Sequence, residues 1–228
     1  STSSSSLSDD SCPKLYGKLT KKEQQCSVSQ ADQALYVAMD CEMVGVGPDG
    51  RKSALARVTM VDWNNDIIYD TYVCPQDEVS DYRTFVSGIT AEDLMGNNAI
   101  TFETCREQVL DLIDGKVIVG HALKNDLAAL RIKHPWQHTR DTGKYEPFMK
   151  TRFDDGVLWP RKLRDLVHDM LSREIQTNQH SPYEDAMAAL DLYKLVRPKW
   201  EKVMDYKIRK TAEITEQKCD TVLQCLSA

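Results

Sequence analysis

The sequence has little of the cysteine patterning that builds disulfide-stapled or zinc-bound folds. Its 228 residues include seven cysteines, an odd number that is scattered along the chain and contains no C-x-x-C pair. This spacing argues against a disulfide framework and a zinc ribbon, and it favours a reducing intracellular compartment. Hydrophobic residues make up 41% of the chain and charged residues 28%, which is enough for one domain with a sizeable core.

Long hydrophobic runs are also missing. No apolar run approaches the roughly 18 residues that a membrane span requires. The N-terminus begins with the polar run Ser1–Ser6 and lacks the apolar core of a signal peptide. We therefore expect an intracellular protein with no membrane partner.

Positive charge is in short supply overall. Lys and Arg number 29 against 35 Asp and Glu, a formal net charge of −6, and phosphate backbones repel an acidic protein. The charge is uneven, however, because residues 61–115 hold twelve acids and two bases whereas residues 131–164 hold nine bases and four acids. The basic stretch fits a face toward a nucleic-acid strand and also an ordinary solvated face. Its notable members are Lys150, Arg152, Arg161, Lys162 and Arg164.

The chain divides into three parts by composition. Residues 1–33 are rich in Ser, Lys and Gln and are interpreted as a flexible tail, residues 34–200 as the folded domain, and residues 201–228 as a charged helical extension or tail. The domain opens with three apolar segments joined by short turns, which predict an antiparallel meander. Helical and short strand-like segments then alternate, so we expect an α/β fold with helices against a mixed sheet.

Two acidic residues interrupt the first predicted strand. Asp40 and Glu42 are spaced by two and therefore lie on one face of that strand. Buried carboxylates are costly unless cations neutralise them, and hard divalent cations prefer carboxylate oxygens. Acid-x-acid pairs also arise by chance in so acidic a chain, so the pair alone leaves a metal site and a solvated charge pair equally open.

Three further residues gain meaning only together. Asp126 follows the strand-like segment 117–119, and Asp185 lies in the first turn of the last predicted helix. Each alone is typical of a surface Asp that the helix dipole favours. His180 precedes the cap of that last helix, and a lone loop histidine is usually just solvated. If Asp185 binds metal, however, His180 would lie beside a metal-bound water.

The ordered set resembles the three motifs of the DEDDh 3′→5′ exonucleases. Residue 181 is Ser, where the related tyrosine-dependent class has Tyr. Longer motifs extend the resemblance over residues 35–200: Asp40–Gly45 (DCEMVG), Ala54–Val58 (ALARV), Asp81–Arg83 (DYR), Val86–Thr90 (VSGIT), Val119–Asp126 (VGHALKND) and His180–Asp185 (HSPYED). In these motifs the chain resembles the RNA exonuclease 4-like branch, which also contains the interferon-stimulated exonuclease.

The resemblance implies a ribonuclease H-like fold, with a mixed five-stranded sheet flanked by helices. It implies that two Mg²⁺ or Mn²⁺ ions hydrolyse single-stranded RNA from its 3′ end to 5′-mononucleotides. His180 becomes the general base, and Met43 and Arg83 contact the terminal nucleotide. The metal ligands are then Asp40, Glu42, Asp126 and Asp185.

The resemblance also suggests ribosomal RNA processing in the nucleus or nucleolus. Two alternatives stay open: a DNA-directed 3′→5′ exonuclease, and a catalytically silent RNase H-like module that binds RNA. The 2′-hydroxyl distinguishes RNA from DNA, and its recognition cannot be read from one sequence. The silent module is the weaker alternative, because all four acids and the histidine are present. Oligomeric state is left undetermined.

Overall fold

The computed structural model describes residues 28–152 and 154–226. Its centre is a mixed sheet in the order β5-β3-β2-β1-β6-β7, with β4 paired to β1. A separate two-stranded hairpin, β8–β9, lies apart from it. The strands are β1 (Tyr36–Val46), β2 (Lys52–Val61), β3 (Ile67–Cys74), β4 (Val79–Asp81), β5 (Ala99–Thr101), β6 (Val117–Gly120), β7 (Thr139–Asp141), β8 (Lys150–Thr151) and β9 (Leu158–Trp159).

The predicted meander is confirmed. β1 pairs antiparallel with β2, and β2 pairs antiparallel with β3, whereas β6 and β7 add parallel to the other side of β1. The predicted α/β class with a mixed sheet is therefore correct, but the predicted number of five strands is too low. The main sheet has seven strands among the described residues. The underestimate arises at β4, β5 and β7, which have three residues each and are too short to show a hydrophobic period.

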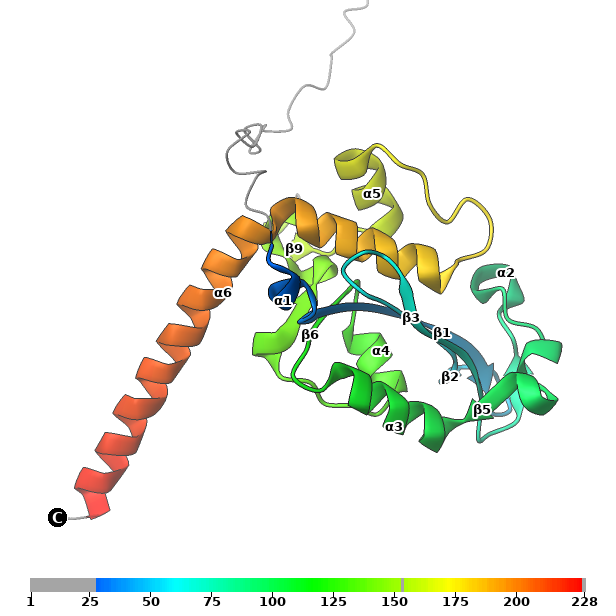
Figure 1. Cartoon of the computed structure of the whole chain (residues 1–228), viewed down its shortest axis with the longest axis horizontal. Coiled ribbons are helices and arrows are strands. Elements are labelled where there is room, and N and C mark those ends of the chain that lie inside the picture. The colour runs from blue at the N-terminus through cyan, green and yellow to red at the C-terminus, as the bar shows by residue number, and fades with distance from the viewer. Residues whose placement is uncertain (1–27, 153, 227–228) are drawn as a thin grey trace, which may run out of the picture.

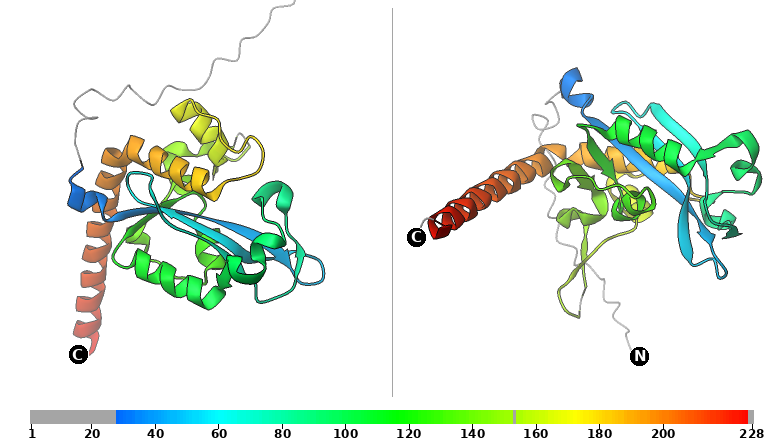
Figure 2. Two further views of the ribbon diagram at one scale, coloured as in Figure 1. Left: turned by 45° about the vertical axis from the view of Figure 1, so that its right-hand side comes forward. Right: turned by 90° about the horizontal axis from the view of Figure 1, so that it is seen from below.

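Helices cover both faces of the sheet (Figure 1). The α-helices are α1 (Gln30–Gln33), α2 (Thr84–Ser87), α3 (Phe102–Ile113), α4 (Lys124–Ala129), α5 (Leu163–Leu171) and α6 (Pro182–Leu226). Helices α3 and α4 pack on one face, while α5 and α6 pack on the other; the left view in Figure 2 shows the same layering. Short 3-10 turns complete the loops, at Glu92–Leu94, Gly96–Asn98, Trp136–His138, Thr142–Lys144 and Glu146–Phe148.

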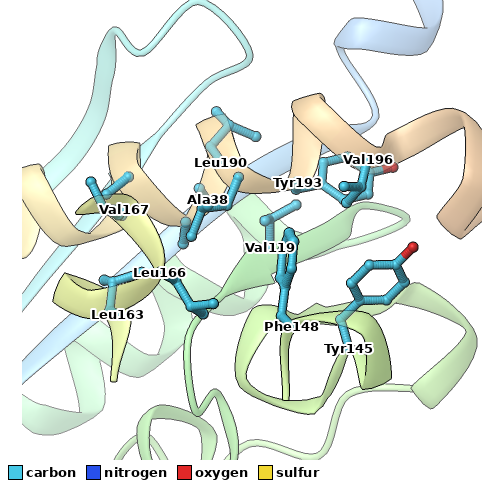
Figure 3. Packing of buried hydrophobic residues seen from close by; sticks show 14 of the residues in the cluster. Ala38, Val119, Tyr145, Phe148, Leu163, Leu166, Val167, Leu190, Tyr193 and Val196 are labelled. Atoms are coloured by element: carbon cyan, nitrogen blue, oxygen red, sulfur yellow. The ribbon is translucent and has the colours of Figure 1, made fainter. Parts of the chain in front are cut away.

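The central strand β1 sends alternate side chains to the two faces. Tyr36 and Ala38 pack in the core beneath α5 and α6, whereas Val37 and Met39 pack in the core beneath α3 and α4. Figure 3 shows the first of these cores, where Ala38 lies among side chains of α5 and α6. Because both faces are buried, the first strand reads as a continuous apolar run. The same alternation places Asp40 and Glu42 on the α6 face of β1.

Helix α6 begins at a cap that the sequence predicts. The Ser181 hydroxyl accepts a hydrogen bond from the Glu184 N–H at 3.4 Å, and Pro182 occupies the first helical position. The helix then runs for 45 residues, and its second half leaves the body of the molecule at an angle to the first (Figure 1). Pro198 lies inside the helix, where it removes one backbone hydrogen bond and accounts for a bend.

The predicted domain boundaries stay predictions, but the structure adds detail at both. Residues 1–27 of the predicted tail lie outside the described residues, and Gln30–Gln33 form a single exposed helical turn. At the other boundary α6 crosses residue 200 without a break, and buried contacts continue to Met204. None of the helices within the described residues combines the length and hydropathy that a membrane span needs.

Candidate active site

The four predicted acids and the predicted histidine line one pocket of about 510 Å³. Asp40 and Glu42 come from β1, Asp126 from the first turn of α4, and Asp185 from the first turn of α6. The alternation of β1 explains the meeting, because Asp40 and Glu42 follow Ala38 on the face that α6 covers. The lining residues are Asp40, Cys41, Glu42, Met43, His121, Asn125, Asp126, Lys162, Leu163, Arg164, Gln176, His180 and Asp185.

Glu42 is buried beside Arg57, whose guanidinium already pairs with Asp70. It lies opposite Arg57 in the β1–β2 register, and a register shift follows between Glu42 and Met43. Arg57 donates two hydrogen bonds to Asp70, from Nε at 2.8 Å and from Nη2 at 2.7 Å. The guanidinium therefore offsets the charge of Glu42 only in part.

Two of the acids are oriented by hydrogen bonds. The Cys41 N–H donates to Oδ1 of Asp126 at 3.0 Å, which ties α4 to β1. The Gln176 side-chain amide donates to Oδ2 of Asp185 at 2.7 Å. The second oxygen of Asp185, Oδ1, is buried and accepts no hydrogen bond from any described residue. A buried carboxylate oxygen without a partner is costly, so this atom fits a role as a cation ligand.

The electrostatics of the pocket reflect this concentration of negative charge. Burial, followed by repulsion from Asp126 and Asp185, raises the pKa of Asp40 well above its ordinary value. Burial raises the pKa of Glu42 to about 8, that of Asp126 to about 7 and that of Asp185 to about 6. These shifts arise because desolvation and like charges both disfavour ionised carboxylates. A bound cation would favour the ionised carboxylates and so lower these pKa values.

His180 lies in the loop before α6, as predicted. Its backbone N–H donates to the carbonyl of Val86 at 2.8 Å, which ties this loop to α2. Its imidazole Nδ1 lies 3.5 Å from Oδ2 of Asp185, and about one third of the side chain is exposed. The ring is therefore held at the pocket while keeping access to water.

The donor set fits divalent cations in kind. Four carboxylates supply hard oxygen ligands, one of their oxygens is buried without a partner, and burial raises the pKa of all four. As the side chains stand, no three His, Cys, Asp or Glu residues of the described chain converge closely enough to enclose an ion. Repulsion among carboxylates opposes such convergence until a cation is present.

The two predicted substrate contacts differ in position. Met43 lines the pocket. Arg83 is not among the lining residues, and its guanidinium instead donates to Ser53 Oγ at 2.9 Å and to the Gly50 carbonyl at 3.0 Å. Its role toward the terminal nucleotide stays a prediction.

Two other lining residues, His121 and Gln176, are not among the predicted site residues, although His121 stands in the motif Val119–Asp126. Gln176 belongs to an irregular loop, and only the tertiary fold brings it to Asp185. His121 Nδ1 lies 2.9 Å from the hydroxyl of Thr142, which itself donates to the Gly120 carbonyl. The hydroxyl hydrogen is thus committed, so the imidazole Nδ1 acts as the donor to Thr142 and the ring orders this loop.

Known proteins are similar to this chain in sequence. Over 168 residues the chain is 42% identical to RNA exonuclease 4 of Saccharomyces cerevisiae, which covers 74% of this chain and 56% of that protein. Over 182 residues it is 42% identical to the human interferon-stimulated 20 kDa exonuclease-like 2, covering 78% of this chain and 51% of the relative. The chain therefore spans about half the length of the curated relatives it matches.

Solved structures agree with the sequence comparison. The Pan2 pseudoubiquitin hydrolase-RNA exonuclease module of Saccharomyces cerevisiae in complex with A7 RNA matches with a TM-score of 0.64 at 28% identity, over 78% of this chain and 31% of that one. The Pan2 catalytic unit of Neurospora crassa matches with a TM-score of 0.63 at 25% identity, over 79% and 30%. The family model of the RNase T exonucleases matches residues 37–193, a range that includes all five residues of the site. The chain belongs to the RNase T exonuclease family.

Proposed function

We propose that this chain is a metal-dependent exonuclease that removes 5′-mononucleotides from the 3′ end of single-stranded RNA. The observation that carries the proposal is the convergence of four carboxylates from β1, α4 and α6 on one pocket that also holds His180. Relatives named RNA exonuclease 4, and neighbours solved with RNA, favour RNA over DNA as the substrate.

The acids of the pocket would hold the cofactor. Asp40, Glu42, Asp126 and Asp185 are its proposed ligands, and Asp185 offers the partnerless Oδ1. Two Mg²⁺ or Mn²⁺ ions, when bound, would stabilise the attacking and leaving oxygens of an in-line displacement at phosphorus. The burial that raises the pKa values of these acids also lowers the local dielectric constant, which strengthens their interaction with a bound cation.

His180 is the proposed general base. Its Nδ1 is turned toward Asp185, so Nε2 is the nitrogen left to accept a proton from the attacking water. Histidine is the side chain that most often transfers protons in catalysis, which suits this role. The hydrogen bond from its backbone to Val86 positions the loop, and Asp185 stabilises the ring once it is protonated.

Digestion of labelled oligonucleotides tests the reaction directly. Single-stranded RNA and DNA of the same sequence, each labelled at the 5′ end, are incubated with Mg²⁺, and one RNA sample carries a 3′-phosphate block. We expect a ladder of shortened RNA, little cleavage of DNA, and inhibition by the block. A ladder that ignores the block would contradict the direction, and equal cleavage of DNA would favour the DNA-directed alternative. RNA that is bound but never cut would identify a silent binding module.

We also propose that the chain acts in the nucleus or nucleolus on ribosomal RNA precursors. This rests on the resemblance of its motifs to the RNA exonuclease 4-like branch. Imaging of the tagged protein, together with sizing of precursor ribosomal RNA ends after depletion, tests both parts. Cytoplasmic signal with unchanged precursor ends would reject them.

A further inference from the structure

A second hollow adjoins the catalytic pocket. It has a volume of about 650 Å³ and shares two lining residues, Arg164 and Gln176, with that pocket. Gln176 is also the residue that donates to Asp185, so one side chain contacts both the hollow and a proposed metal ligand. Its lining residues are Lys150, Arg161, Arg164, Asp165, His168, Asp169, Glu174, Ile175, Gln176 and Thr177.

The β8–β9 hairpin carries an exposed indole, that of Trp159, on the strand opposite Lys150, which lines this hollow. Lys150, which lines it, pairs directly with Trp159, and Thr151 pairs with Leu158. Directly opposed residues of an antiparallel pair project from the same face, so Trp159 shares the face of Lys150 while Leu158 lies on the other. The Arg152 guanidinium lies 4.5 Å from the centroid of the Trp159 ring and therefore belongs to the same face.

The basic side chains on the path from the catalytic pocket through the hollow to the hairpin are only partly neutralised. Arg161 is engaged in an ion pair with Asp169, and Arg164 Nε lies 3.9 Å from Asp165. Lys150 and Lys162 form no ion pair with any residue that the structure describes. Unpaired ammonium groups therefore stand at both ends of the path, Lys150 beside the indole and Lys162 in the catalytic pocket.

The exposed Trp159 ring of the hairpin could stack against a ligand with a flat apolar face. Trp159 is 44% exposed although Arg152 covers part of its ring, so indole surface remains available. An aromatic ring flanked by cations is how proteins bind single-stranded nucleic acid without reading its sequence, through stacked bases and neutralised phosphates.

We propose that this hollow and the Trp159 face of the hairpin bind the nucleotides that lie 5′ of the terminal nucleotide in single-stranded RNA. The inference rests on the proposed function, which puts the 3′ end in the catalytic pocket. The strand then leaves past Gln176 and Arg164, one base stacks on Trp159, and Lys150 contacts a phosphate.

Kinetics on substrates of two lengths test the proposal. The Trp159→Ala variant should raise the KM for a 12-nucleotide RNA by about 5- to 150-fold with little change in kcat, as expected for one lost stacked base. Hydrolysis of a dinucleotide, which is too short to reach the hairpin, should not change. Trp159→Phe keeps an aromatic face and should restore most of the affinity. The Lys150→Gln variant should reduce the slope of log affinity against log salt by about 0.7.

Leu158→Ala is the matched control. Leu158 is the neighbour of Trp159, is similarly exposed at 41%, and projects from the opposite face. It should behave as the unmodified chain on both substrates. Equal losses in the Leu158→Ala and Trp159→Ala variants, or a loss on the dinucleotide as large as on the 12-nucleotide RNA, would overturn the proposal.

Binding separates the failure of this inference from the failure of the proposed function. If the unmodified chain cuts no RNA, the proposed function fails. Fluorescence anisotropy of the labelled 12-nucleotide RNA, measured with EDTA present, then still shows whether the Trp159 surface binds RNA. Weaker binding by Trp159→Ala than by Leu158→Ala supports it, and equal binding rejects it.

Discussion

The imidazole of His180 faces the carboxylate of Asp185, with Nδ1 3.5 Å from Oδ2. The same oxygen accepts a hydrogen bond from Gln176 at 2.7 Å, so the amide and the imidazole compete for one atom and leave Oδ1 free. Asp185 can therefore serve a cation with one oxygen and the base with the other. This division separates two functions that substitutions can distinguish.

Removal of the His180 imidazole should abolish turnover without abolishing metal binding. The His180→Ala variant should lose about 10²- to 10⁴-fold in kcat, because a general base contributes that much. Mg²⁺ should still raise its melting temperature, because all four carboxylates remain. His138→Ala, an exposed histidine outside the pocket, is the control and should retain activity. Near-normal activity of His180→Ala at neutral pH would show that another group takes the proton.

The acidic pocket predicts that the metal-free protein loses stability as pH rises. Burial raises the pKa of Glu42 to about 8 and that of Asp126 to about 7, above their ordinary values of 4.5 and 3.8. Between those limits the folded state holds protons that the unfolded state has already released, so rising pH favours unfolding. The melting temperature in EDTA should therefore fall between pH 5 and pH 8, and Mg²⁺ should restore it most at the alkaline end.

Asp40→Asn provides the comparison for this titration. The amide removes one buried negative charge, so the melting temperature in EDTA should depend less on pH than that of the unmodified chain. The variant should also lose turnover and most of the stabilisation by Mg²⁺. A pH slope in EDTA as steep as that of the unmodified chain would mean that other groups cause it.

The body of the molecule should need the first turn of α6 beyond residue 200. Arg140, whose side chain is 4% exposed, donates to both oxygens of Glu201 at 2.8 Å, and the Tyr193 hydroxyl donates to Oε1 at 2.8 Å. The Glu201→Ala variant leaves the guanidinium buried and unpaired, which should cost about 3–5 kcal/mol in the free energy of unfolding.

Two further measurements isolate this ion pair. Chains that end at residue 200 should melt well below chains that end at residue 210, because only the longer ones retain Glu201 and Met204. The double variant Arg140→Met with Glu201→Leu should be more stable than Glu201→Ala alone, because it buries no unpaired charge. Equal urea midpoints for both truncations would show that α6 contributes nothing to the body beyond residue 200.

The parts of the site that could be predicted are those with a local period or cap. Asp40 and Glu42 interrupt an apolar strand, and Asp185 follows a capped helix start, so strand alternation and helix geometry indicate their faces, whereas only the resemblance to the DEDDh exonucleases joined them into one site. Gln176 and His121 could not be found this way, because they stand in irregular loops and reach the pocket only through contacts distant in sequence.

The fold shows the same limit. β1, β2 and β3 are long enough to show their burial pattern, whereas β5 and β7 have three residues each and exist because a neighbouring edge is available to pair with. The β8–β9 hairpin is shorter still. Its basic residues were visible in the sequence, but the pairing that puts Trp159 beside Lys150 was not.

Gly120, the last residue of β6, should be essential because its missing side chain lets β6 lie close to β1, which carries Asp40. An added Cβ would lie 2.4 Å from Leu123 Cδ2 and 2.8 Å from the carbonyl oxygen of Met39, which directly precedes Asp40. Leu123 can turn away, but the Met39 carbonyl is backbone, so β1 and β6 must separate. Gly120→Ala should therefore lower the free energy of unfolding by about 1–3 kcal/mol.

The same separation of β1 from β6 should lower kcat strongly even in protein that stays folded. It shifts Asp40 on β1 relative to Asp126, which follows β6, and misplacement by about 1 Å can cost 10²-fold in rate. Gly143→Ala is the graded control, because its added Cβ meets its nearest neighbour, Asp141 Oδ1, only at 3.2 Å. We expect small losses there in both melting temperature and kcat. If Gly120→Ala melted and turned over like Gly143→Ala, the close approach of β1 and β6 would have no role in placing the carboxylates.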